Sequence, residues 1–169
     1  MRNLLTGIIL TLLLAACGFQ LRGFVTLPFE SLYVNGGGNP VLAEEIGRAI
    51  SSGTETRLVD KPADAQAVLQ VFGASREKRI LSLTGAGRVR EYQLIYRISF
   101  QLIDKSGRDL IPVQSLELRR DMSYDDTQVL AKEQEEALLY HDMQNDATMQ
   151  LMRRLAAVKL PPADAKDQR

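Results

Sequence analysis

VREYQLIYRISFQLI, which runs from Val89 to Ile103, is the clearest pattern in the chain. Apolar and aromatic side chains fall on every second position: Tyr92, Leu94, Tyr96, Ile98, Phe100 and Leu102. The positions between them are mostly polar, with Ile95 and Ile103 as exceptions. A period of two predicts a long β-strand with one buried face and one wet face, because a helix would spread the same residues around its circumference.

The chain before this strand predicts one strand and one helix. Ser31–Val34 reads as a strand, stopped by Asn35 and by glycines 36–38. These glycines lack the Lys and Ser/Thr of a phosphate-binding loop, so we interpret them as an ordinary loop. A helix follows with Asn39 as N-cap and Pro40 in its first turn. Its apolar residues recur at helical spacing: Leu42, Ile46, Ala49 and Ile50.

Two further strands are expected to pair with the long one as an antiparallel meander. Ala67–Phe72 reads as a strand that continues toward Ile80, and a glycine-containing turn then leads into the long strand. Asp104–Arg108 reads as a tight turn into the third strand. That strand has apolar residues on one parity: Leu110, Leu116, Leu118, Met122 and Tyr124. Pro112 cannot donate a ladder hydrogen bond, so it belongs near the strand's start or at a sheet edge.

A long helix from about Thr127 to Val158 completes the domain, with Asp125 and Asp126 suited to its N-terminus. Its expected core-facing stripe is Ala137, Tyr140, Met143, Ala147, Leu151, Leu155 and Val158. The order β-α-β-β-β-α predicts one α+β domain over residues 17–160. We expect a mainly antiparallel four-stranded sheet with two helices packed on one face. Residues 161–169 are expected to be a disordered tail.

Residues 1–16 have the features of a signal peptide. A positive Arg2 precedes an apolar run that is shorter than the roughly 20 residues needed to span a bilayer. The run ends in Leu-Ala-Ala-Cys17, which resembles the lipobox of bacterial lipoproteins. In such proteins the cysteine becomes the first mature residue and carries fatty acyl chains, palmitate among them. Gly18 rather than Asp follows, so we expect an anchor on the periplasmic side of the outer membrane. An ordinary signal peptide with an unmodified cysteine is the alternative.

Composition favours a binding protein over an enzyme. Lys+Arg and Asp+Glu both number 21, which argues against a general nucleic-acid binder. The single histidine, His141, lies mid-helix and reads as a structural residue, and there is no cluster of Cys and His with metal-ligand spacing. Glu133, Glu135 and Glu136 read as a charged helix face. We therefore expect no catalytic residue, no metal and no cofactor.

Four motifs together resemble the LptE family of lipopolysaccharide-assembly lipoproteins. They are residues 14–23 around the lipobox, Glu91-Tyr92-Gln93-Leu94 in the long strand, Gly107–Pro112, and Leu130–Glu133. The resemblance implies a small α/β domain that plugs the outer-membrane β-barrel LptD. It also implies that the two proteins insert lipopolysaccharide into the outer leaflet and that this protein binds lipopolysaccharide. Lys132 matches a family lysine implicated in that binding. Gly85 occupies a place where the resemblance leads us to expect a basic residue, with Arg88 and Arg90 nearby.

Basic residues on both sides of the expected turn at Gly85 and Gly87 are the candidates for contact with the phosphates of lipid A: Arg76, Lys78, Arg79, Arg88 and Arg90, together with Lys132. Arg88 and Arg90 share the parity of Tyr92, so the core should end before them. A solvated hairpin tip, with charges that discourage aggregation, is the alternative. For the whole protein, an auxiliary lipoprotein of another lipid or phospholipid transport system remains an alternative, and an anchored enzyme is a more distant one.

The lipobox makes the first prediction. Cys17→Ala should yield a protein that is unlipidated and either uncleaved or misprocessed, because the only thiol of the chain has been removed. Mass spectrometry of the mature N-terminus checks this. An unmodified Cys17 in the wild-type protein would refute the predicted anchor.

Overall fold

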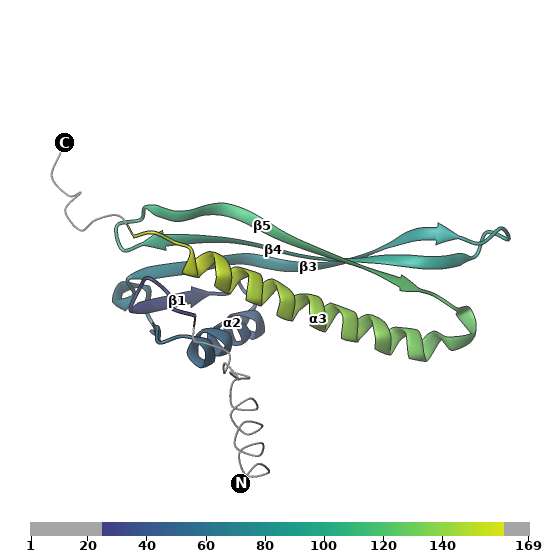
Figure 1. The fold of residues 1–169 in the computed structure, drawn as a ribbon, viewed down its shortest axis with the longest axis horizontal. Coiled ribbons are helices and arrows are strands. Elements are labelled where there is room, and N and C mark those ends of the chain that lie inside the picture. Colours follow the sequence, from purple (N-terminus) through teal and green to yellow (C-terminus); the bar gives the residue numbers. More distant parts are fainter. Residues whose placement is uncertain (1–24, 161–169) are drawn as a thin grey trace, which may run out of the picture.

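The computed structural model describes residues 25–160, which form a twisted five-stranded sheet with two helices on one face (Figure 1). The elements are β1 (Ser31–Asn35), α2 (Pro40–Gly53), β2 (Arg57–Leu58), β3 (Ala67–Leu83), β4 (Val89–Asp104), β5 (Asp109–Ser123) and α3 (Val129–Ala156). Short 3₁₀ turns at Pro62–Asp64 and Asp126–Gln128 precede β3 and α3. The predicted signal peptide, the lipidation site Cys17 and the tail from 161 to 169 lie outside the described residues.

The sheet has the strand order β2-β1-β3-β4-β5. The antiparallel meander β3–β4–β5 is confirmed, but β1 runs parallel to both of its neighbours. The expectation of a four-stranded, mainly antiparallel sheet was therefore wrong in the number of strands, and the sheet is mixed because two of its four pairings are parallel. The missed strand, β2, is only two residues long, which is too short to produce a periodic pattern. Helix α2 carries the chain between β1 and β2, as a crossover between parallel strands requires.

The predicted alternation in β4 is confirmed. Five of its six apolar positions are at most 1% exposed: Leu94, Tyr96, Ile98, Phe100 and Leu102. Tyr92 is partly buried at the distal end, the end of the sheet that carries the β3–β4 turn. Ile95 is also buried, although it belongs to the opposite parity. The even-numbered face of β4 therefore lies in the core, and the odd-numbered face is polar apart from Val89, Ile95 and Ile103.

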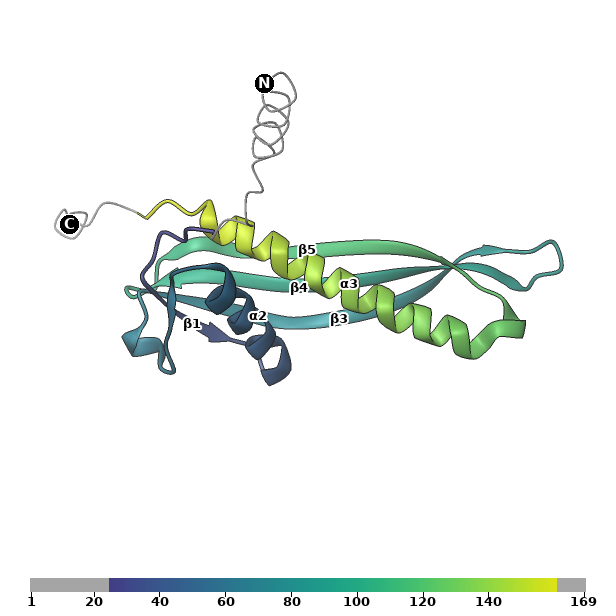
Figure 2. The same ribbon diagram turned by 60° about the horizontal axis from the view of Figure 1, so that its bottom comes forward.

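Both helices cover this even-numbered face of β4, as predicted (Figures 1 and 2). Asn39 Oδ1 accepts the Leu42 amide at 3.1 Å and caps α2, whose Ile46 and Ile50 are fully buried. The buried stripe of α3 begins at Tyr140 and continues to Leu155. Ala137 is exposed, so the expected stripe was wrong there. The N-terminal half of α3 lies beyond the apolar core and contacts the sheet through polar side chains.

Bulges in β3 decide which of its side chains face the helices. The register with β4 shifts between Val71 and Ala74, and Gly73 has φ +119°, a conformation that favours glycine. Val71, an odd-numbered residue, is buried before the bulge, whereas after it Arg76 and Lys78 oppose the core residues Tyr96 and Leu94. The bulge therefore directs two cations toward α3.

The second prediction follows from the burial of the even-numbered side chains of β4. Ile98→Ala should lower the free energy of unfolding by about 2–5 kcal/mol, because a fully buried side chain is truncated. Gln93→Ala should change it by roughly 0.5 kcal/mol or less, because that side chain donates to Asp121 Oδ1 at 3.1 Å on the exposed face. Urea denaturation of both variants checks this, and equal losses would mean that the two faces have been assigned wrongly.

Candidate functional site

The six predicted basic residues do not form one patch. Arg76, Lys78, Arg88 and Lys132 make contacts on the helix side of the sheet, and we call these four the helix-side basic cluster. Arg79 lies on the opposite, open face of the sheet, where it pairs with Glu77. Arg90 is exposed near the β3–β4 turn and shares the parity of Tyr92, and its carbonyl accepts the Tyr124 amide at 2.8 Å.

Lys78 has the most elaborate surroundings in this cluster. Its Nζ lies 4.3 Å from the centre of the Tyr92 ring and 6.0 Å from that of Tyr124. These two rings meet edge to face, with centroids 5.1 Å apart. The same Nζ is 2.6 Å from Glu136 Oε2 of α3. Aromatic faces attract cations, so the two rings form a favourable, half-buried site for the Lys78 ammonium group. Glu136 neutralises the charge of that ammonium group.

Arg76 links the middle of α3 to the sheet. Its guanidinium carbon lies 5.3 Å from the Tyr140 ring centre, and Nη2 donates to Gln144 Oε1 at 3.1 Å. The Gln144 amide in turn donates to Glu45 of α2, whose other carboxylate oxygen is buried and has no hydrogen-bond partner among residues 25–160. The Tyr140 hydroxyl donates to the Glu77 carbonyl at 2.7 Å, and burial raises the pKa of Tyr140. Polar contacts therefore hold this part of α3 against β3 and α2.

Lys132 and Arg88 hold the first turns of α3 near the distal end of the sheet. Lys132 Nζ lies 2.8 Å from Glu135 Oε2 and 3.1 Å from Ser123 Oγ at the end of β5. Arg88, next to the β3–β4 turn, lies 3.2 Å from Asp126 Oδ2 before α3. The four cations of the cluster thus follow the seam between the sheet and the N-terminal half of α3.

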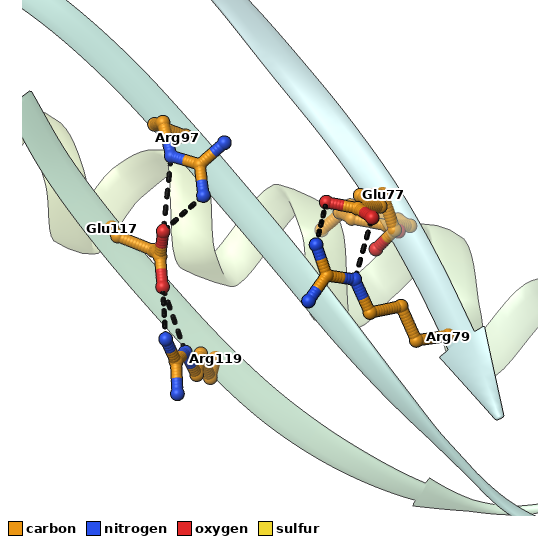
Figure 3. Close-up of polar contacts among 6 residues, drawn as sticks. Glu77, Arg79, Arg97, Glu117 and Arg119 are labelled. Atoms are coloured by element: carbon orange, nitrogen blue, oxygen red, sulfur yellow. Dashed lines mark hydrogen bonds and ion pairs between the residues drawn. The ribbon is translucent and has the colours of Figure 1, made fainter. Parts of the chain in front are cut away.

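The open face carries a second set of charges (Figure 3). Glu117 of β5 accepts from Arg97 of β4 with one carboxylate oxygen and from Arg119 with the other. Hydrogen bonds from these two guanidiniums hold the pKa of the Glu117 carboxyl below its usual range. Glu77 and Arg79 form a separate two-bond pair on β3, which lowers the pKa of Glu77.

This open-face network explains why Ile95 is buried on the polar side of β4. Ile95 lies opposite Glu77 on one neighbouring strand and Arg119 on the other. Long arginine side chains can cover apolar surface with their methylene groups while the charged ends stay in water. Ile95 is only 2% exposed, so the open face presents polar groups and no apolar patch at this position.

The sequence did not reveal the partners of the cations. Its patterns predict Tyr92, Tyr124 and Tyr140 as core residues and Glu136 as part of a solvated helix face. Only the three-dimensional fold brings these side chains to Lys78 and Arg76. His141 is exposed, and its Nε2 lies 3.2 Å from Asn145 Nδ2. Within residues 25–160 there is no group of side chains arranged to hold a metal ion. Among the helices of that range, none has the length and apolar character to cross a membrane.

Comparison with known proteins supports the resemblance read from the motifs. The family model of lipopolysaccharide-assembly proteins, LptE, matches residues 29–155. The LPS-assembly lipoprotein LptE of Photorhabdus laumondii is 32% identical over 163 residues, which cover 89% of this chain and 86% of that protein. Its counterpart from Yersinia enterocolitica is 28% identical over 150 residues, covering 87% of this chain and 72% of that protein.

Solved lipoprotein structures share the fold. The solution structure of an uncharacterized lipoprotein B from Nitrosomonas europaea is 42% identical, with a TM-score of 0.73 over 83% of this chain and 91% of that one. The crystal structure of the rare lipoprotein B from Shewanella oneidensis is 27% identical, with a TM-score of 0.63 over 75% of this chain and 94% of that one. The match over residues 29–155 and the relatives of similar length show that the chain belongs to the LptE family of lipopolysaccharide-assembly lipoproteins.

Proposed function

We propose that this lipoprotein is anchored through Cys17 at the periplasmic side of the outer membrane and plugs the lumen of a β-barrel of the LptD type. The two proteins together insert lipopolysaccharide into the outer leaflet. The observation that carries the proposal is the two-sided sheet, in which one face is buried under α2 and α3 and the other carries paired polar side chains along β4 and β5. The role is one of binding and assembly, without an enzymatic reaction.

The open face is suited to a wet barrel interior. Its polar side chains are joined across β4 and β5 by four pairs: Gln93–Asp121, Arg97–Glu117, Ser99–Ser115 and Gln101–Asp109. The interior of large outer-membrane barrels is polar, so such a face loses little by leaving bulk water for the lumen.

The length of the sheet also fits a lumen. β4 has 16 residues, which at about 3.3 Å per residue gives a strand of roughly 50 Å. A bilayer with its headgroup regions is about 40–45 Å thick. A domain of this length can therefore extend through a barrel from one side of the membrane to the other.

Detergent extraction makes the third prediction. The affinity-tagged, lipidated wild-type protein should copurify with one β-barrel protein at a constant ratio, because a plug is enclosed by its partner. An unrelated lipoprotein carrying the same tag is the control. Absence of a barrel would favour the alternative, an auxiliary lipoprotein of another lipid transport system.

The helix-side basic cluster is the proposed contact for lipopolysaccharide, with Arg90 beside it. Three of its four cations, Lys78, Arg88 and Lys132, form salt bridges with carboxylates, and the carboxylate is exposed in Arg88–Asp126 and Lys132–Glu135. Exposed ion pairs contribute little stability, so the cations can exchange these carboxylates for phosphates at small cost. The anionic head of a glycolipid is the ligand that such a row of cations fits. Arg79 lies on the open face and is not part of this contact.

The fourth prediction tests that contact. Arg88→Glu combined with Arg90→Glu should weaken lipopolysaccharide binding, most strongly at low salt, while the fold and barrel association persist. Binding to the purified protein is measured at two salt concentrations. Arg57→Glu with Lys159→Glu is the matched control, because it makes the same change in charge at exposed positions away from the cluster. Binding as tight as wild type in the first variant would mean that these arginines only solubilise the hairpin tip.

A further inference from the structure

Most of β3 has a neighbouring strand on one side only. β1 pairs with β3 from Leu32↔Ala67 to Asn35↔Gln70 and then ends. The loop after β1 closes against the next residue, since a Cβ added to Gly37 would lie 2.1 Å from the Val71 carbonyl oxygen. β3 continues to Leu83, paired only with β4. Residues 72–83 therefore form a free strand edge within the described part of the chain.

One hydrogen bond shows which backbone groups point out of this edge. The Glu77 carbonyl accepts from the Tyr140 hydroxyl, so it points away from β4. The register with β4 is unbroken from Ala74 to Ile80, and backbone groups in a strand alternate between its two sides. Ser75 and Arg79 therefore also direct their N–H and C=O groups toward the free edge. Among the described residues no acceptor is bonded to these amides on that side.

Apolar side chains are exposed along the same strand. Phe72, Ile80, Leu81 and Leu83 are 52%, 59%, 46% and 53% exposed. Phe72 precedes the regular stretch 74–80, Ile80 is its last residue, and Leu81 and Leu83 follow it. Within residues 25–160, β4 has no large apolar side chain exposed to this degree and β5 has only Val113. A free edge flanked by exposed apolar residues is the feature that recruits an additional strand.

The other edge of the sheet is less suited to pairing. Pro112 lies in β5 without an amide to donate, and the register with β4 is broken beside it. The difference between the two edges therefore lies in this proline and the irregular register beside it.

We propose that the free edge of β3 binds an extended segment of the partner protein as a sixth strand. The backbone of that segment pairs with Ser75, Arg79 and the Glu77 amide, while the Glu77 carbonyl keeps its hydrogen bond from Tyr140, and its apolar side chains cover Ile80 and Phe72. Of the three cations at residues 76–79, Lys78 and Arg79 are paired with carboxylates, whereas Arg76 contacts only the neutral Gln144 and Tyr140 within residues 25–160, so an acidic residue of the segment is favoured beside Arg76. This inference rests on the proposed function for the identity of the partner as a β-barrel. Continuity with the β1–β3 pairing supports it, because the same edge already forms a ladder at its proximal end.

Ser75→Pro is the variant that tests it. Proline removes the outward amide and leaves the ladder with β4 intact. Ser75 is exposed, and its side chain makes no hydrogen bond within residues 25–160. Ser75→Ala is the matched control, because it removes the hydroxyl and keeps the amide. Each tagged variant is coexpressed with untagged wild type, and the barrel recovered with the tagged protein is measured. Loss of one net hydrogen bond predicts a reduction of roughly fivefold for Ser75→Pro and none for Ser75→Ala.

Hydrogen exchange on the wild-type protein gives a second measurement that requires no substitution. In the isolated domain the amides of Ser75, Glu77 and Arg79 should exchange fast, and those of Arg76 and Lys78 slowly. In the barrel complex all five should be slow. Suppose that the wild-type protein recovers the barrel, that Ser75→Pro recovers as much of it in competition with wild type, and that the amides of Ser75, Glu77 and Arg79 still exchange fast in the complex. The strand-addition proposal is then wrong, while the plug proposal stands. Protection of the odd-numbered amides in a dimer of the isolated domain would also overturn it, since a second copy would then be the occupant.

Discussion

Burial of the even-numbered face of β4 under α2 and α3 is the interaction on which the rest of the structure depends. Leu94, Ile98 and Phe100 are almost completely removed from water there, and the helices approach from the same side. Because side chains in a strand alternate between faces, this burial fixes the odd-numbered positions on the open side. The polar pairs of that open face thus follow from the same alternation that builds the core.

The two halves of α3 make different kinds of contact with the sheet. Its C-terminal half contributes the apolar residues Met143, Leu151 and Leu155 to the core. Its N-terminal half is held by side-chain bridges from the sheet, such as Lys78–Glu136 and Lys132–Ser123. Charge-assisted contacts near the surface can be exchanged for a ligand's phosphates, whereas buried apolar contacts cannot be exchanged without unfolding. Binding chemistry can therefore reside at the distal end while the proximal core preserves the fold.

Much of the fold could be predicted because its main strands and helices are long and periodic. The β4 alternation, the Asn39 cap and the Asp104–Arg108 turn each have a local physical cause, and all three are present. β2 was missed because two residues carry no period. The placement of the site residues depended on the bulge near Gly73, which exchanges the faces of β3. Alternation alone places Lys78 and Arg79 on opposite faces, but the bulge decides which of the two faces the helices. The lipid anchor at Cys17 stays a prediction.

Site-specific photocrosslinking tests most directly the claim that the two faces meet different molecules. A photoreactive amino acid replaces Glu133, an exposed residue beside Lys132 on α3, or Ser99 in the middle of the open face. After irradiation of cells, adducts are separated and probed for lipopolysaccharide and for the barrel. The account predicts a lipopolysaccharide adduct at position 133 and a barrel adduct without lipopolysaccharide at position 99. Lipopolysaccharide adducts of equal yield at both positions would contradict it.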